Sequence, residues 1–192
     1  MKPLFASAAL LALMSGTALA ADASVVGDWL VKDGYAHIRI DNCAGKMWGI
    51  VAWEKTPGGL DTENPDPAKK SRPTLGMPIL LGLAPVPKEP GKWAGEIYNS
   101  QNGKMYTANI SLADENTLDL EGCLVWPLCQ TQQWTRVKAP PANAQPLPPI
   151  KGTATPPAKQ AAAKKGAASA PSDTCLRVAD EAAAQERAGA KK

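Results

Sequence analysis

Two short motifs, Gly27-Asp28-Trp29 and Trp134-Thr135-Arg136, constrain the fold more than any other feature of this sequence. The first opens a strand-like, aromatic stretch and the second closes it. A Gly-x-Trp on a first strand and an arginine on a last strand suit a β-sheet that closes into a barrel. The indole would plug one end, and the guanidinium would lie across its face in a cation–π contact worth roughly 0.5–2 kcal/mol. We therefore predict structural roles for Gly27, Trp29, Trp134 and Arg136.

Hydrophobic alternation with a period of two runs through the sequence between these motifs and predicts β-strands. Asn102-Gly103 joins two such runs and is a strong signal for a hairpin turn. No helical pattern separates the runs, so we predict an all-β, antiparallel sandwich or barrel of about seven or eight short strands. The expected strands are residues 29–31, 35–40, 47–53, 93–98, 104–110, 117–121 and 131–137.

Residues 55–90 break this rhythm, because they hold eight prolines and four glycines and no long alternating run. Loops beyond about 12–15 residues are uncommon in compact domains and are usually functional or disordered. The apolar residues from Leu75 to Leu83 predict that part of this loop packs against the barrel. We expect the whole stretch to form a lid-like, Pro-rich loop.

The first twenty residues have the pattern of an export signal. Lys2 supplies a minimal positive region, Leu4 to Met14 is an apolar run, and Ala18-Leu19-Ala20 is a cleavage site. The apolar run is too short to span a bilayer, which needs roughly 20 residues, and no cysteine follows the cleavage site to carry a lipid. We expect residues 1–20 to be removed and the mature chain to be secreted into a bacterial periplasm, with no segment that spans the membrane.

The positive charge of the chain belongs to its tail. Residues 21–138, the expected barrel domain, carry 12 Lys and Arg against 14 Asp and Glu, whereas residues 139–192 carry 8 against 4. The domain therefore has no basic footprint for nucleic acid. The tail could contact an anionic envelope component by charge, or it could be a solvated spacer.

The tail itself divides in two. Residues 139–172 are rich in Pro, Ala and Lys and poor in large apolar side chains, which predicts a disordered linker. Residues 173–192 predict a short helix within a basic tail, with Ser172 or Asp173 as its cap. One side of that helix would carry Leu176, Ala179 and Ala183.

Four cysteines remain after export, and an oxidising compartment makes disulfides the expected state. Cys123 and Cys129 would close a small ring, which adds on the order of 2 kcal/mol in the loop-entropy model. Cys43 and Cys175 are either paired with each other or free. A metal site is not expected, because the spacings are not C-x-x-C and His37 is the single histidine.

A set of motifs spread over residues 26–138 is specific as a whole, although no single piece is. They are Gly27-x-Trp29, residues 38–43, Gly49-Ile50-Val51 with Trp53, Asp61-x-x-Asn64-Pro65-Asp66-Pro67, Arg72-Pro73, Gly76, Gly95-x-Ile97-Tyr98, Gly103-Lys104-x-Tyr106, and Gly122-Cys123 through Cys129 to Trp134-Thr135-Arg136.

On these motifs the chain resembles a family of exported bacterial proteins called domain of unknown function 2147. The resemblance implies a lipocalin-like β-barrel and an envelope location, and it implies no activity. Some members carry a second cysteine where this chain has Trp48. That departure leaves Cys43 without a nearby partner and favours either a free thiol or a bond to Cys175.

The acidic part of the long loop is the sharpest candidate site. Asp61, Asn64 and Asp66 offer several oxygens within six residues, which could suit a hard cation such as Ca²⁺, but the spacing is not that of an EF-hand. The favoured interpretation is that Asn64-Pro65 and Asp66-Pro67 build successive turns. Arg72 would pair with Asp61 or Asp66 and hold the loop at the barrel rim, where a ligand anion could compete for it.

The aromatic side chains suggest a cavity. The sequence has six tryptophans, several of which must fill the core, while two or three of them, with two tyrosines, could line a space for an apolar or ring-shaped ligand. Together with the acidic loop they give the eight ligand-site candidates Trp53, Asp61, Asn64, Asp66, Arg72, Trp93, Tyr98 and Tyr106.

These observations favour non-catalytic binding of a small, partly apolar ligand in the barrel mouth, beneath the loop at 55–90. Arg72, Asp61 and Asp66 would meet the polar end of the ligand. The alternative is an envelope-interaction protein with a packed barrel, whose basic tail and rim engage peptidoglycan, anionic lipid or a protein. A hydrolase comes third, because His37 has no readable partner spacing for nucleophilic catalysis. No cofactor is expected.

Overall fold

The computed structural model describes residues 24–125, 127–150 and 172–189. The predicted signal peptide, Trp126 and most of the predicted linker, residues 151–171, lie outside the described residues. Among the residues described, no helix has the length and hydropathy that a bilayer crossing requires.

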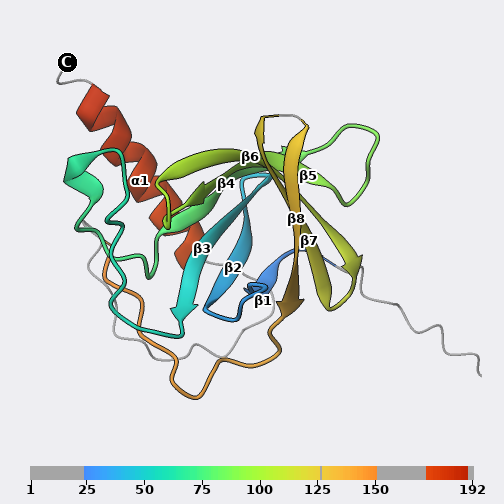
Figure 1. Ribbon diagram of the computed structural model, residues 1–192, viewed down its shortest axis with the longest axis horizontal. Coiled ribbons are helices and arrows are strands. Elements are labelled where there is room, and N and C mark those ends of the chain that lie inside the picture. The colour runs from blue at the N-terminus through green and yellow to red at the C-terminus, as the bar shows by residue number, and fades with distance from the viewer. Residues whose placement is uncertain (1–23, 126, 151–171, 190–192) are drawn as a thin grey trace, which may run out of the picture.

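Eight antiparallel strands form a closed barrel in simple sequence order, and β8 pairs with β1 to complete it (Figure 1). The predicted all-β fold and the Asn102-Gly103 hairpin between β5 and β6 are both present. The strands are β1 (Gly27–Leu30), β2 (Ala36–Cys43), β3 (Lys46–Glu54), β4 (Pro78–Pro85), β5 (Trp93–Asn99), β6 (Lys104–Asp114), β7 (Thr117–Val125) and β8 (Leu128–Arg136).

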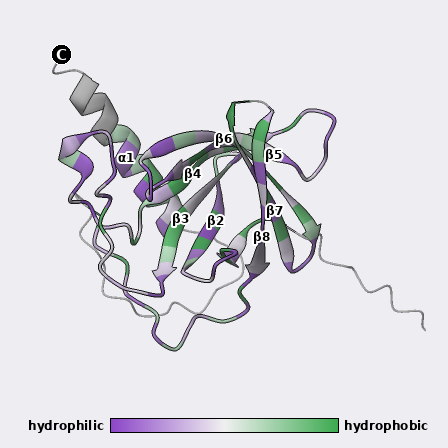
Figure 2. Cartoon of the chain, in the orientation of Figure 1, coloured by the Kyte–Doolittle hydropathy of each residue, from purple (hydrophilic) through white to green (hydrophobic). Residues whose placement is uncertain are grey.

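The core follows from the alternation of side chains along these strands. Hydrophobic and hydrophilic residues alternate on the barrel strands, so one face of each strand supplies the interior (Figure 2). Cross-strand pairs such as Trp29 with Ile38 and Leu118 with Trp134 place large apolar side chains opposite one another. All four belong to the buried core.

One end of the barrel is sealed as the sequence predicts. Trp29 is fully buried, and its Nε1 donates to the carbonyl of Val25 at 2.8 Å. The Arg136 guanidinium lies 4.1 Å from the Trp29 ring and donates to the carbonyls of Val26 and Ser24 at 3.0 and 2.6 Å. We call this the closed end.

Gly27 belongs to the same arrangement. Its φ of 137° is a conformation that L side chains rarely adopt, and a Cβ at this position would lie 2.9 Å from Nη1 of Arg136. The glycine of the first motif therefore leaves room for the arginine of the second.

The long Pro-rich loop is shorter than predicted, because its last part is β4. Pro78 and Pro85 stand at the first and last positions of this strand, where a missing N–H disturbs the ladder least. Gly82, with φ of 61°, sits at an irregularity between Leu81 and Ala84 where the pairing with β5 shifts. The prolines and the bulge hide the alternation that identifies the other strands.

The predicted linker contacts the barrel where it is described. The side chain of Gln145 accepts from the backbone N–H of Glu54 at 3.2 Å and donates to its carbonyl at 2.7 Å. Asn143 accepts from Nε1 of Trp53 at 3.2 Å. Residues 143–145 therefore hold the end of β3.

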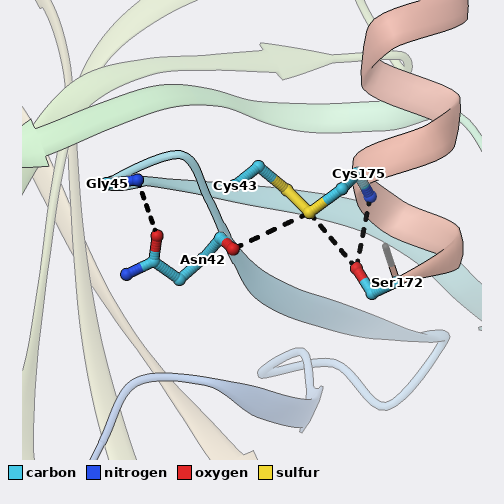
Figure 3. The surroundings of a disulfide bond; sticks show 5 residues. All are labelled: Asn42, Cys43, Gly45, Ser172 and Cys175. Carbon is cyan, nitrogen blue, oxygen red and sulfur yellow. Dashed lines mark hydrogen bonds between the residues drawn. A yellow bond between two sulfur atoms is a disulfide. The ribbon is translucent and has the colours of Figure 1, made fainter. Parts of the chain in front are cut away.

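The chain ends in the helix α1 (Asp173–Gly189), which lies on the outside of the barrel beside the loop that carries the short helix η1 (Pro67–Lys69) (Figure 1). A disulfide between Cys43 and Cys175 joins the first turn of α1 to the end of β2 (Figure 3). Ser172 caps the helix, since its Oγ accepts from the backbone N–H of Cys175 at 3.3 Å. The open question of these two cysteines is settled in favour of a pair.

The helix docks on a different face from the apolar side that the sequence suggests. Thr174 and Val178 are buried, whereas Leu176 and Ala179 are exposed. Glu181 lies on the docked face and pairs with residues of the long loop. The disulfide at Cys175 and the ion pairs of Glu181 with Lys69 and Arg72 tie this face of α1 to the barrel and the long loop.

Candidate ligand-binding site

A cavity of about 910 Å³ opens at the end of the barrel opposite Trp29. Its lining residues come from the β1–β2 and β5–β6 turns, from the β3–β4 loop at Thr56 and Thr74, and from the strands that lead to this end of the barrel. Ligand pockets generally measure about 300–1,000 Å³, and small barrels hold them at the mouth. The space is therefore large enough for one small molecule.

The cavity has an apolar depth and a polar rim. Among its lining residues, Val31, Ile38, Val51, Leu120 and Trp134 are buried members of the barrel core. Amide and hydroxyl side chains also line it, among them Ser100, Gln101, Asn102, Tyr106, Gln130 and Gln132, and the exposed Leu124 and Leu128 stand with them at the opening. This gradient suits a ligand with an apolar body and one polar end.

Glu54, at the end of β3, is the one formally charged residue among the described residues that line the cavity. It pairs across the sheet with Ala36, another lining residue. Its Oε1 accepts a hydrogen bond from the Thr74 hydroxyl. Its Oε2 is buried without a hydrogen-bond partner among the described residues.

Sequence reasoning missed Glu54. Ala36 and Ile38 alternate with His37 and identify the inner face of β2, but the matching inner positions on β3 are Val51 and Glu54, which do not alternate. A shift in pairing between His37 and Ile38 absorbs the extra residue. Strict period-two counting therefore places Glu54 on the outside.

Behind one wall of the cavity, Asp61 forms the centre of a buried polar cluster. Its side chain is fully buried and accepts from Tyr98 Oη at 2.6 Å, Asn64 Nδ2 at 2.7 Å and Arg72 Nε at 2.8 Å. The Arg72 guanidinium also lies 5.8 Å from the centre of the Tyr98 ring. Tyr98 itself lines the cavity, so this cluster fixes a wall residue.

The turns predicted for the acidic loop are present. Asn64 Oδ1 accepts from the backbone N–H of Asp66 at 2.9 Å, and Asp66 Oδ1 accepts from that of Ala68 at 3.0 Å. The side-chain oxygens of both residues accept hydrogen bonds from nearby backbone N–H groups. The Asn-Pro-Asp-Pro pattern is therefore explained by the turns that it forms in the loop.

The same loop is tied to α1 through Glu181. Lys69 Nζ and Arg72 Nη1 lie 2.8 and 3.2 Å from its Oε1. Burial alone would raise the pKa of Glu181, but the hydrogen bond from Lys69 and the charges of Arg72 and Lys69 outweigh it and lower the pKa. The ion pairs therefore link the C-terminal helix to the cluster around Asp61.

The eight predicted ligand-site residues separate into three groups. Tyr98 and Tyr106 line the cavity, and Asp61, Asn64 and Arg72 stand behind Tyr98. The other three lie away from it: Asp66 caps η1, Trp53 contacts His37 with ring centres 4.5 Å apart and ring planes tilted by 41°, and Trp93 lines a groove at the closed end.

His37 does not line the cavity. Burial lowers its pKa, against an opposing effect from the charge of Asp28. Its ring contact with Trp53 therefore involves an imidazole that is mainly neutral at pH 7.

The β7–β8 hairpin forms the most exposed part of the rim. The predicted disulfide between Cys123 and Cys129 closes it. Leu124, Val125 and Leu128 at its tip are 52%, 60% and 66% exposed, and both strands of the tip are hydrophobic (Figure 2). The disulfide thus holds these apolar side chains exposed to solvent beside the cavity.

Titration of the tyrosines provides a test of the Asp61 cluster. Burial is the main cause that raises the pKa of Tyr98 to about 12, and the hydrogen bond and charge of Asp61 add to it. Since the folded-state pKa exceeds the ordinary 10.0, the stability from this group is present below pH 10 and is lost as the pH rises toward 12.

Tyrosinate absorbance measured on the native protein should therefore show a late ionisation that disappears in Tyr98→Phe. If the native protein ionised all three of its tyrosines together near pH 10, the hydroxyl of Tyr98 would not be buried on Asp61.

Comparison with known proteins identifies the family and a related fold. A model of the family described as an uncharacterised protein conserved in bacteria, domain of unknown function 2147, matches residues 27–136. The curated proteins contain no match to the chain.

A solved structure is also similar. It is that of protein HP1028 from the human pathogen Helicobacter pylori, described as belonging to the lipocalin family. The two agree with a TM-score of 0.54 and 20% sequence identity, over 59% of this chain and 83% of that chain. At this identity the likeness shows the fold alone. The chain thus has a lipocalin-like barrel and belongs to the bacterial family named domain of unknown function 2147.

Proposed function

We propose that this protein binds a small, partly apolar molecule in the open mouth of its barrel, without catalysis. The observation that carries the proposal is the cavity of about 910 Å³, with its buried apolar depth and polar rim. A lipocalin-like fold is compatible with that function. The buried apolar lining residues support a ligand whose inner part is apolar.

We further propose that the protein works in the periplasm. The signal-like first twenty residues support export. Two disulfides, Cys43–Cys175 and Cys123–Cys129, are typical of proteins that leave the reducing cytoplasm.

Blocking the cavity from within tests the binding function. Gly122 lines the cavity, and a Cβ placed on it would meet nothing within 4 Å. Gly122→Phe should therefore fill the space without a clash and weaken binding of the neutral fluorophore N-phenyl-1-naphthylamine by about tenfold or more. Fluorescence titration of the full mature chain measures this affinity.

The matched control is Thr131→Phe. Thr131 pairs with Glu121 on the neighbouring strand, is exposed and does not line the cavity, so it adds the same ring outside the barrel. Equal affinity in the wild type and Thr131→Phe, with a loss in Gly122→Phe, supports a ligand in the mouth. Unchanged affinity in Gly122→Phe would contradict it.

A second candidate function is attachment to an envelope component through the rim. The exposed apolar tip of the β7–β8 hairpin favours it. Val125 is exposed and does not line the cavity, so Val125→Glu separates the two functions. It should leave probe binding unchanged, whereas attachment through the tip would be lost in a sedimentation assay with isolated envelopes.

A further inference from the structure

The described side chains that line the cavity carry formal charge of one sign only, which is negative. The described lining residues include amides, hydroxyls and three tyrosines, all of which are neutral at pH 7, and one carboxylate, that of Glu54. Lys55 follows the lining residue Glu54 in the sequence, and Lys104 follows the β5–β6 turn. Both lysines are exposed, and neither lines the cavity. A ligand in this space therefore meets one negative charge and no positive one from the described lining.

The cation that the sequence predicts at the polar end of a ligand is already engaged. It is Arg72, predicted there together with Asp61 and Asp66. Its Nε is bonded to the buried Asp61 at 2.8 Å, and its Nη1 is 3.2 Å from Glu181. Recruiting it for an anionic ligand would leave the fully buried Asp61 without its counter-charge, which is costly.

One carboxylate oxygen of Glu54, in contrast, lacks a donor among the described residues. Oε1 accepts from the Thr74 hydroxyl, but Oε2 is buried and has no partner among the described residues. Buried carboxylate oxygens without donors are costly, and native proteins satisfy nearly all of them. Gln145 holds the backbone N–H and carbonyl of Glu54, so the backbone of this lining residue is fixed while its carboxylate can still rotate.

From these observations we propose that the ligand carries a protonated amine, and that Glu54 binds it. The inference rests on the proposed binding function and names the class of ligand that the mouth selects. Rotation of the carboxylate brings Oε2 toward the cavity, where an ammonium group donates to it. Neutral hydroxyl and amide oxygens on the rim accept its other protons. The apolar part of the ligand lies against Ile38, Leu120 and Trp134.

Three ligands of the same length test this selection. Octylamine, octan-1-ol and octanoate share one alkyl chain and differ in the charge of the end group. Each would displace N-phenyl-1-naphthylamine from the full mature protein at pH 7. A charge-assisted hydrogen bond to a buried carboxylate is worth about tenfold or more in affinity. We therefore expect octylamine to bind at least about tenfold more tightly than octanoate, with octan-1-ol between them.

Glu54→Gln keeps the shape and removes the charge, and should reduce octylamine affinity to that of octan-1-ol. Glu121→Gln is the control, because it removes one negative charge from a residue that does not line the cavity. It should preserve the preference for the amine. Retained fluorophore binding in Glu54→Gln shows that the variant is folded.

The outcomes separate the two proposals. If neither the fluorophore nor octan-1-ol binds the wild type, the binding function itself fails. If both bind but octylamine and octanoate compete equally, or octanoate competes better, the cavity binds apolar molecules and the assignment of Glu54 as an amine site is overturned. The wild-type series gives this answer even if Glu54→Gln does not fold.

Discussion

Replacing Asp61 with alanine is expected to lower the free energy of unfolding by about 3–5 kcal/mol, the usual cost of removing one partner from a buried ion pair. Asp61 is fully buried and receives hydrogen bonds from Tyr98, Asn64 and Arg72. Its removal leaves an arginine, an amide and a hydroxyl without their acceptor. The loss should be large because all three donors converge on one side chain.

Urea denaturation of Asp61→Ala measures this loss, and Asp66→Ala is the matched control. Asp66 is exposed and accepts from Ala68 at the start of η1, so its removal should cost about 0.5–2 kcal/mol, as for other helix caps. Similar losses in the two variants would contradict a central role for the Asp61 cluster. Asp61 would then contribute no more to the free energy of unfolding than the turn residue Asp66 does.

Replacing Trp29 with alanine is expected to cost about 3–5 kcal/mol, as large-to-small changes of aromatic residues in cores do. Trp29 is fully buried, donates to Val25 at 2.8 Å and stacks under Arg136 at 4.1 Å. The variant loses the packing of the indole, one buried hydrogen bond and the cation–π contact. It also opens the closed end of the barrel to water.

Thermal and urea unfolding of Trp29→Ala should be compared with those of Trp93→Ala. Trp93 is only partly buried and lines a groove at the closed end, so the same change should cost less there. A loss for Trp29→Ala that is no greater than that for Trp93→Ala would show that the indole does not plug the barrel.

The sequence predicts the barrel well because two independent signals agree. Alternation along the strands sets which face is buried, and the Gly27-x-Trp29 and Arg136 motifs set where the sheet closes. The alternation matches the buried core, and the two motifs match the observed pairing of Trp29 on β1 with Arg136 on β8. Consistency between local pattern and global closure is what makes such a prediction reliable.

The parts that the sequence did not predict depend on contacts between distant residues. Prolines at both ends of β4 conceal its strand pattern, although it pairs with β3 and β5. The docked face of α1 is chosen by a disulfide to Cys43 and by ion pairs from Glu181 to the long loop. Neither the strand β4 nor the docked face of α1 can be recognised from a local hydrophobic pattern.

The candidate site shows the same division. Tyr98 and Tyr106 were predicted from their aromatic character, and both line the cavity. Arg72 and Asp61 were predicted as ligand contacts, yet they satisfy each other behind the wall. Glu54 was missed, because an irregularity between β2 and β3 turns it inward against strict alternation.

The binding claim is tested most directly by amide chemical shifts of the isotope-labelled protein during titration with octylamine. We expect the perturbed amides to cluster around the cavity, at Glu54, Ser100, Gly122 and Gln130, while those beside Trp29 and Arg136 at the closed end stay unchanged. Perturbations confined to the exposed hairpin tip, to α1 or to the closed end would place the ligand elsewhere and contradict a site in the barrel mouth.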